Sequence, residues 1–208
     1  AHMGLHYPEK RWDDLESKVS FAAHELEFEN TKAYVNYLLS SPDRKKDIET
    51  LAAFLTIGET YFFREKDCFN TIEKHIIPEL ISSRTRNDRD KSLRIWSAAC
   101  CTGEEPYSIA ILLDKLIPDP EDWDVTILGS DINHCFLQKA AEGVYKEWSF
   151  RDVPLSIKKE YFRVTNNGSY EIIPRIKKMV KFFNHNLIKE ANPSLENNAM
   201  DLILCRNA

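Results

Sequence analysis

Two carboxylates stand where an apolar, strand-like run passes into a helix, and both could contact a bound ligand. The stretch 94–108 begins apolar, continues through small residues and ends in a helical pattern that has Glu105 near its start. Asp131 follows a second apolar run at 124–130. In open α/β sheets, ligands bind at the carboxyl ends of the strands, where an acid can accept hydrogen bonds from ribose hydroxyls. The pattern therefore indicates a nucleoside-type site.

The charge of these groups restricts the ligand. Glu105 at a helix start would repel a phosphate but would tolerate a positive centre such as a sulfonium or an amino group. The six glycines form neither a G-x-G-x-x-G nor a Walker loop, which argues against dinucleotide and P-loop sites. We therefore expect an adenosine-containing ligand without phosphates. The alternative is structural: Thr102 and Glu105 have capping-box spacing, Pro106 suits a first helical turn, and Asp131 could cap the following helix.

Cysteine and histidine spacings do not indicate a metal or disulfide framework. The five cysteines are odd in number and form no C-x-x-C, and the six histidines form neither H-x-x-x-H nor H-E-x-x-H. No metal site is expected, and a reduced cytoplasmic setting fits this usage. The adjacent Cys100 and Cys101 suit a loop close to a ligand better than a redox pair.

The first 85 residues read as helical. Apolar spacing predicts a helix over 13–29, a second one capped by Asn30 or Thr31, and a third one after a break at 40–43. A fourth is predicted from about 66 to 82, where Pro78 would kink or shorten it. The polar stretch 84–92 reads as an exposed linker or a solvated helix end.

After residue 92 the pattern alternates between strands and helices. Strands are predicted at 93–99 and 124–130, each followed by a helix, and this order favours a parallel sheet with helices on its faces. Asn167-Gly168 predicts a hairpin between 161–165 and 170–173. The last predicted strands are 179–183 and 200–204. Because a doubly wound sheet needs more strands, we expect the chain to be a fragment.

Composition agrees with a folded protein of ordinary type. The chain has 208 residues, 43% of them hydrophobic and 29% charged, which fits one or two domains. A net charge of −5 argues against a nucleic-acid partner, and no apolar run is long enough for membrane insertion. Residues 1–3 resemble a cloning remnant and are set aside.

Several short motifs occur here in the order typical of one family. They are Thr60-Tyr-Phe-Phe-Arg64-Glu, the Trp96–Ser108 run with Thr-Gly-Glu-Glu-Pro-Tyr-Ser, Ser130-Asp-Ile132, Asn186-Leu187 and Cys205-Arg-Asn207. The chain thereby resembles the CheR family, the S-adenosylmethionine-dependent methyltransferases of bacterial chemotaxis receptors. The resemblance covers almost the whole chain and is firmest from residue 56 onward.

The resemblance implies an α/β fold with an N-terminal all-α domain over 1–85. A Rossmann-like S-adenosylmethionine-dependent methyltransferase domain would follow over 93–208, truncated, with a small antiparallel β-subdomain at about 158–176. It also implies an enzyme, a protein-glutamate O-methyltransferase. Such an enzyme transfers a methyl group from S-adenosyl-L-methionine to glutamate side chains in the cytoplasmic domain of a chemotaxis receptor, giving glutamyl methyl esters and S-adenosyl-L-homocysteine.

Two other functions are weighed against this one. The first is a regulatory or scaffolding module of a larger signalling protein that binds S-adenosylmethionine or S-adenosylhomocysteine without catalysis. The second is a nicotinamide dehydrogenase on the same α/β plan, which the missing glycine loop disfavours.

The family's site residues map onto nine positions. Those expected at the cofactor are Gly58, Thr60, Arg64, Glu105, Asp131, Asn186, Leu187, Asn207 and Ala208. Arg64 is also the expected catalytic residue, because a guanidinium can orient the substrate carboxylate bidentately. The reaction needs no strong base, since that carboxylate is already ionised. Without the resemblance, an ion pair of Arg64 with Glu65 or Asp67 would be the simpler interpretation.

The sequence departs from the family pattern in several places. Gly58 stands where many members have Asn, and Ala208 is the last residue, where a hydrophobic residue and later a site tyrosine usually follow. On that basis the 208 residues alone are expected to be weakly active or inactive. Residues 1–50 carry seven Lys or Arg and ten Asp or Glu, a balance of −3, although a basic helix is thought to face the receptor in the family. A basic cluster (Arg175, Lys177, Lys178, Lys181) either steers an acidic partner or protects a strand edge.

Overall fold

The computed structural model describes residues 4–86, 91–188, 195 and 200–207, without the side chains of residues 44, 45 and 86. The set-aside residues 1–3, part of the predicted linker and the site candidate Ala208 lie outside the described residues.

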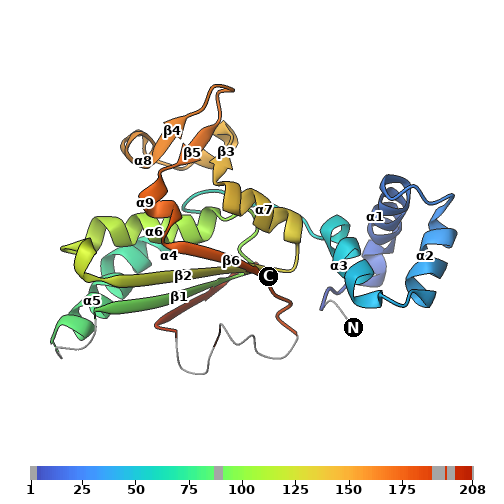
Figure 1. Ribbon diagram of the computed structural model, residues 1–208, viewed down its shortest axis with the longest axis horizontal. Coiled ribbons are helices and arrows are strands. Elements are labelled where there is room, and N and C mark those ends of the chain that lie inside the picture. The colour runs from blue at the N-terminus through green and yellow to red at the C-terminus, as the bar shows by residue number, and fades with distance from the viewer. Residues whose placement is uncertain (1–3, 87–90, 189–194, 196–199, 208) are drawn as a thin grey trace.

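A four-stranded parallel sheet forms the centre of the molecule (Figure 1), as the alternating pattern predicts. In sheet order its strands are β6 (Val180–Asn184), β2 (Asp124–Asp131), β1 (Ser92–Ala98) and β7 (Leu202–Cys205). β1 and β2 pair from Ser92 opposite Asp124 to Ala98 opposite Ser130. Because all four strands run the same way, their carboxyl ends meet at one edge, and that edge carries the candidate site.

Two helices follow the central strands and pack on the sheet. They are α6 (Glu104–Leu116) after β1 and α7 (His134–Glu142) after β2. α7 begins where the Asn133 side chain accepts hydrogen bonds from the amides of Cys135 and Phe136. It ends at Gly143, whose φ of +66° suits glycine.

The capping box expected at the start of α6 is wrong. The N-cap is Gly103, with φ +92°, and the Thr102 hydroxyl donates to the carboxylate of Glu104 at 2.7 Å. A Cβ at Gly103 would lie 2.8 Å from the Cβ of Ala140, so helix α7 leaves room only for glycine. Close packing of two helices therefore decides this cap, which local spacing does not reveal.

Three helices at the amino end form a separate apolar cluster, seen at the right of Figure 1. They are α1 (Trp12–Glu25), α2 (Thr31–Ser40) and α3 (Arg44–Leu55), preceded by a 3-10 turn, η1 (Glu9–Arg11). Asn30 caps α2 as predicted, accepting from the amide of Ala33 at 2.9 Å. The cluster buries Ala22, Tyr34 and Leu55, and α3 lies against α7.

The predicted fourth helix is longer than expected. It comprises α4 (Lys66–Thr71), a π-helical turn η2 (Ile72–Ile76) and α5 (Ile77–Arg86). In the π turn, the amide of Ile77 donates to the carbonyl of Ile72, five residues back. This widened turn precedes Pro78, where an α-helical bond is missing, and lets the helix continue.

A smaller, three-stranded antiparallel sheet stands beside the main one, at the top of Figure 1. Its strands, in sheet order, are β3 (Val144–Tyr145), β5 (Tyr170–Ile172) and β4 (Phe162–Val164). The helical segments around it are η4 (Glu147–Phe150), α8 (Leu155–Tyr161) and α9 (Pro174–Lys177), while η3 (Pro120–Asp122) precedes β2.

The main apolar core unites both sheets with α4–α6. Phe62 lies in it, completely buried, with its ring 4.8 to 5.1 Å from those of Tyr145, Phe150 and Phe162. The segment before α4 is thereby fixed to the small sheet. Within the described part of the chain, no helix has both the length and the apolar character needed to cross a bilayer.

Candidate functional site

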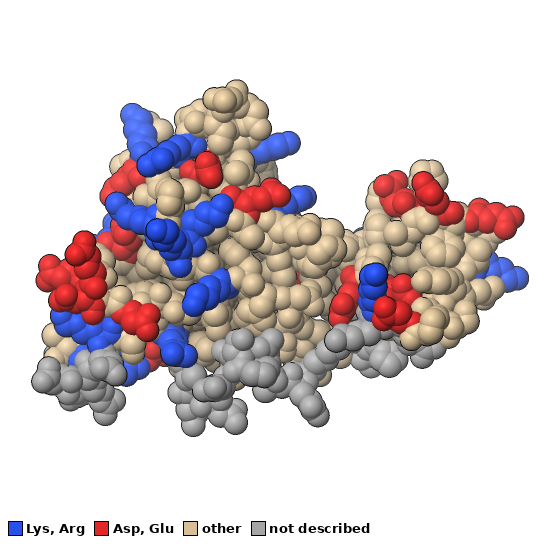
Figure 2. Space-filling view, viewed as in Figure 1, with Lys and Arg blue, Asp and Glu red and all other residues tan. Residues whose placement is uncertain are grey.

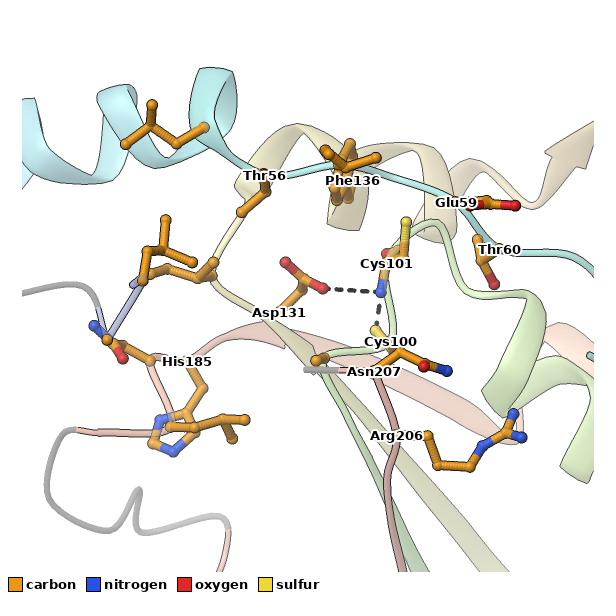
Figure 3. A pocket seen from close by; sticks show the side chains of 18 of the residues that line it. Thr56, Glu59, Thr60, Cys100, Cys101, Asp131, Phe136, His185, Arg206 and Asn207 are labelled. Carbon is orange, nitrogen blue, oxygen red and sulfur yellow. Dashed lines mark hydrogen bonds between the residues drawn. The ribbon is translucent and has the colours of Figure 1, made fainter. Parts of the chain in front are cut away.

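A cavity of about 490 Å³ opens at the carboxyl ends of all four parallel strands. It is lined by residues directly after each strand, among them Ala99, Ile132, Asn186 and Asn207, and Figure 3 shows it from close by. Its volume falls in the usual range for small-molecule sites, about 300–1,000 Å³. Seven of the nine predicted cofactor residues line it: Thr60, Arg64, Glu105, Asp131, Asn186, Leu187 and Asn207.

Asp131 is the most deeply placed acid in this cavity, with 7% of its surface exposed. One carboxylate oxygen accepts a hydrogen bond from the Cys101 amide at 2.9 Å (Figure 3), and the other accepts one from the Asn133 amide at 2.8 Å. Burial raises the pKa of Asp131, and these amide hydrogen bonds oppose the rise. A carboxylate offers about four acceptor positions, so Asp131 can accept two further hydrogen bonds, such as those of a diol.

Glu105 lines the same cavity and is held by two partners. Its carboxylate accepts from the hydroxyl of Ser97 at 2.8 Å and from Nε of Arg206 at 2.7 Å. The side chains of Glu105 and Arg206 are only 12% and 16% exposed. Glu105 thus has a fixed position, from which an unused lone pair can accept from a positively charged donor.

Arg64 reaches the cavity from the segment before α4, and its backbone is firmly held. The neighbouring Phe63 and Glu65 have φ values of +57° and +66°. The amide of Phe63 donates to the Ser108 hydroxyl at 3.0 Å, and the carbonyl of Arg64 accepts from Arg206 at 3.1 Å. Such strained backbone persists where its surroundings hold it, often at functional sites.

The simpler interpretation of Arg64, an ion pair with an adjacent acid, is not what the described residues show. Glu65 instead pairs with Arg206 at 3.1 Å, and the guanidinium of Arg64 donates to the carbonyl of Glu59. Its side chain therefore remains able to receive a carboxylate at the edge of the cavity.

Three of the predicted residues follow strands β6 and β7. Asn186 is buried, and its side-chain oxygen accepts from the amide of Ile188 at 3.1 Å. Leu187 is 40% exposed and adds an apolar surface. Asn207 has φ +54°, and its amide group donates to Glu65 at 3.2 Å.

Gly58 is placed differently from these residues. It does not line the cavity, but a Cβ there would lie 2.7 Å from the ring of Phe136 and 3.2 Å from the sulfur of Cys101. Both of those side chains do line it. The small size of Gly58 therefore allows Phe136 its present position, while Ala208 lies outside the described residues.

Sequence reasoning assigned no role to two residues that organise the site. In the sequence, Arg206 stands out only as the middle residue of the motif Cys205-Arg-Asn207, and its partner Glu105 lies 101 positions away. Glu104 is 2% exposed, accepts hydrogen bonds from the hydroxyls of Thr102 and Ser149, and has a pKa raised by burial. The available signal was helical periodicity, which places Glu104 on the same buried face of α6 as Ser108 and Ile111.

The first described residues also border the cavity. Residues 4–7 line it together with Lys18, and the hydroxyl of Tyr7 donates to the carbonyl of Leu55 at 2.8 Å. A Cβ on Gly4 would lie 2.8 Å from the side chain of Ile188. This segment therefore covers the side of the cavity that faces the amino-terminal helices.

The adjacent cysteines should be poorly reactive. Burial raises the pKa of Cys101 to about 12 and also raises that of Cys100, so at pH 8 only about one Cys101 thiol in ten thousand is a thiolate. We expect iodoacetamide at pH 8 to modify the exposed Cys135 and Cys205 and to spare this pair, as measured by peptide mass spectrometry. Labelling in denaturant is the control, and modification of Cys101 as fast as that of Cys135 would contradict the expectation.

The predicted basic cluster is partly occupied by internal contacts. Figure 2 shows Lys and Arg gathered over the small sheet and α9, whereas the amino-terminal helices show mainly acids. Arg175 pairs with Asp114 at 2.7 Å, and Lys177 donates to the carbonyl of Glu142 at the end of α7. Lys178 and Lys181 are exposed. Half of the cluster therefore stabilises the fold.

In chemical terms, the cavity offers three functions at one sheet edge. Asp131 can accept from hydroxyls, Glu105 can accept from a cationic donor, and Arg64 can receive a carboxylate. Ile132, Phe136 and Leu187 add apolar surface for a planar ring.

Comparison with known proteins agrees with this chemistry. Residues 58–208 match the family described as "CheR methyltransferase, SAM binding domain". The chain is 34% identical over 181 residues to a chemotaxis protein methyltransferase 2 of Vibrio cholerae, covering 87% of this chain and 61% of that protein. It is 33% identical over 207 residues to a chemotaxis protein methyltransferase of Borreliella burgdorferi, covering 99% and 72%.

A third relative is a chemotaxis protein methyltransferase 2 of Pseudomonas aeruginosa, 39% identical over 157 residues, which cover 74% of this chain and 52% of that protein. The chain thus spans between about half and three quarters of the length of these relatives. The family match extends over more than half of the chain and includes the whole sheet edge that carries the cavity. The chain therefore belongs to the CheR methyltransferase family.

Proposed function

We propose that this protein transfers a methyl group from S-adenosyl-L-methionine to glutamate side chains of chemotaxis receptors. The observation that carries the proposal is the meeting of buried Asp131 with Arg64 in one cavity, within a chain matched by the family's S-adenosylmethionine-binding description. The relatives are named as chemotaxis protein methyltransferases, which favours catalysis over a purely regulatory module.

The hydrogen-bond acceptors and apolar side chains of the cavity suit this cofactor. Asp131 has acceptor positions left for ribose hydroxyls, and Glu105, fixed by Ser97 and Arg206, can accept from an amino group. Ile132 and Phe136 provide apolar surface for an adenine ring. Among the described residues, the cations at the cavity mostly have protein partners, as the Arg206–Glu105 pair shows, so no phosphate clamp competes with this assignment.

In the mechanism, the protein mainly positions the reactants. When bound, S-adenosylmethionine supplies an electrophilic methyl group on a sulfonium. Arg64 holds the substrate carboxylate by a charge-assisted, bidentate hydrogen bond. No general base is required because a glutamate carboxylate is ionised at neutral pH. Orientation of two reactants in a confined site accounts for most of the rate.

We propose a division into functional parts, in which α1–α3 have an apolar cluster of their own, whereas α4 and α5 pack in the main core. We assign residues 1–85 to an amino-terminal helical domain and 93–208 to the methyltransferase domain, with the hairpin region at about 158–176, which forms two strands of the small antiparallel sheet, as a subdomain. Thr60 and Arg64 then reach from the first part into the site of the second. The substrate is the cytoplasmic portion of a receptor, which places the enzyme in the cytoplasm.

Titration calorimetry with S-adenosylhomocysteine tests the cofactor site. Asp131→Ala is expected to weaken binding by about 1–3 kcal/mol, the cost of leaving buried polar partners unpaired. Because Asp131 also holds the amides of Cys101 and Asn133, thermal unfolding of the variant must be measured in parallel.

Asp201→Ala is the matched control for this titration. Asp201 also accepts a backbone hydrogen bond, from the amide of Arg94 at 2.8 Å, but does not line the cavity. The Asp201→Ala variant should unfold at a lower temperature than the wild type but bind S-adenosylhomocysteine with the same affinity. Equal affinities for Asp131→Ala and the wild type would overturn the placement of the ribose.

A further inference from the structure

A second arginine is held rigidly outside the cavity, close to Arg64. The guanidinium carbon of Arg151 lies 3.4 Å from the ring centre of Tyr61 and 3.5 Å from that of Trp148. The two ring centres are 6.3 Å apart and the ring planes are inclined at 78°, so the guanidinium lies between the two rings and can stack flat on at most one of them. Trp148 is 53% exposed and Arg151 is exposed as well, which leaves the outer edge of the guanidinium in contact with solvent. We call these three residues the aromatic–arginine cluster.

The acids nearest to Arg151 in the sequence are already paired with lysines. Asp152 pairs with Lys66 at 2.8 Å, and Glu147 pairs with Lys158 at 2.6 Å. Within the described part of the chain, no carboxylate forms an ion pair with Arg151, although its charge acts on the buried Glu104 and opposes the rise in the pKa of that carboxyl. The one side-chain hydrogen bond of Arg151 goes to the carbonyl of Trp148 at 3.4 Å. Since a guanidinium has five N–H donors, most of its capacity is unused.

The cluster is anchored to the segment that carries Arg64. The carbonyl of Ser149 accepts a hydrogen bond from the amide of Phe62 at 3.0 Å. The hydroxyl of Ser149 donates to the carboxylate of buried Glu104 at 3.0 Å. The Tyr61 ring also lies 6.0 Å from the guanidinium carbon of Arg64. One ring therefore touches both an arginine of the cavity and the arginine of the cluster.

We propose that the aromatic–arginine cluster binds a second carboxylate of the substrate polypeptide, next to the glutamate that Arg64 receives. This inference rests on the proposed function and names a specificity determinant for it. A guanidinium held against two rings loses little freedom on binding and can present its fork to a planar carboxylate. On a helical substrate, side chains three or four residues apart have Cβ atoms about 5–6 Å apart, which suits two neighbouring arginines.

Charge favours an acidic polypeptide as the occupant. Arg64 and Arg151 lie beside a site whose proposed substrate group is itself a carboxylate. An acid-rich segment can therefore place a carboxylate against each of the two arginines. A substrate with a single isolated glutamate would engage Arg64 alone and bind more weakly.

The test measures methylation of a receptor cytoplasmic fragment by the natural full-length enzyme, with labelled S-adenosylmethionine. Arg151→Glu is expected to raise KM for the fragment about tenfold or more, and Arg151→Lys about threefold, since it keeps the charge but loses the stacked fork. Lys74→Glu is the control, because this exposed lysine lies on η2, where its neighbour Glu73 pairs with Lys115 in the last turn of α6, at the opposite end of that helix from Glu105. It makes the same charge change away from the site.

A substrate variant separates recognition from general electrostatics. Replacing the acids next to the methylated glutamate with glutamine should lower kcat/KM of the wild type about tenfold and that of Arg151→Glu far less. Equal KM values for wild type and Arg151→Glu, or equal effects of Lys74→Glu, would overturn the inference. Calorimetry with S-adenosylhomocysteine on the same proteins distinguishes a failure of this inference from a failure of the proposed function. A wild-type protein that neither binds S-adenosylhomocysteine nor methylates the fragment refutes the proposed function itself.

Discussion

Replacing Arg206 with methionine is expected to lower the free energy of unfolding by about 3–5 kcal/mol, because it leaves the largely buried Glu105 without its cation. Arg206 contacts Glu105 through Nε at 2.7 Å and Nη2 at 2.6 Å. It also donates to the carbonyl of Arg64 and to Glu65, both at 3.1 Å. One side chain thus joins the end of β7, the start of α6 and the segment before α4.

Urea denaturation followed by tryptophan fluorescence measures this loss. Lys91→Met is the matched control, since Lys91 also forms a close pair with an aspartate, Asp122, at 2.8 Å, but the two side chains are 41% and 58% exposed. Exposed pairs contribute little to stability, so the control should be nearly as stable as the wild type.

A double variant tests the cause. If the loss comes from a stranded charge, Glu105→Gln combined with Arg206→Met should regain much of the stability that Arg206→Met loses. An Arg206→Met variant as stable as the wild type would show that water reaches Glu105 and solvates it. A loss that Glu105→Gln leaves unchanged would instead indicate that the contacts with Arg64 and Glu65 dominate.

The elements of the sheet could be predicted because their signals are local. The strand expected at 124–130 is β2, Asp124–Asp131, and the helix expected after it is α7, His134–Glu142. Apolar runs, a capping side chain at Asn133 and a glycine at 143 define these boundaries within a few residues of sequence.

Where contacts between distant residues determine a helix boundary, local sequence patterns predict it wrongly or not at all. The N-cap of α6 is Gly103 instead of Thr102, and Ala140 leaves no room for a Cβ at that position. The helix that was expected to end near residue 82 continues past Pro78 because a π turn absorbs the missing hydrogen bond.

In the candidate site, too, one part could be predicted from the sequence and another part could not. Seven positions taken from the family resemblance line the cavity, but the resemblance assigned no partners to them. The pairing of Glu105 with Arg206 joins residues 101 positions apart, and the stacking of Arg151 on Tyr61 joins residues 90 apart. Such contacts depend on how strands and loops meet in space, and no periodicity in the chain encodes them.

Arg64→Ala is expected to lower kcat for receptor methylation about a hundredfold, the usual scale for removing one preorganised charge from an active site. Its backbone lies between Phe63 and Glu65, both with positive φ, and is held by Ser108 and Arg206. This arrangement fixes the main chain from which the Arg64 side chain extends, and the guanidinium itself donates to the carbonyl of Glu59. Arg64→Lys should recover only part of the rate, because an ammonium keeps the charge without the bidentate geometry.

The comparison of kcat with cofactor affinity decides what Arg64 does. If it orients the substrate carboxylate, Arg64→Ala should lower kcat much more than it weakens binding of S-adenosylhomocysteine, measured by calorimetry on the same enzyme. Lys74→Ala, on the exposed side of η2, controls for loss of a surface cation and should change neither quantity. A loss of affinity as large as the loss of rate would assign Arg64 to the cofactor alone. Since the carboxylate nucleophile is ionised throughout the neutral range, the Arg64→Ala defect should also stay constant between pH 6.5 and 8.5, roughly two units or more above the ordinary glutamate pKa.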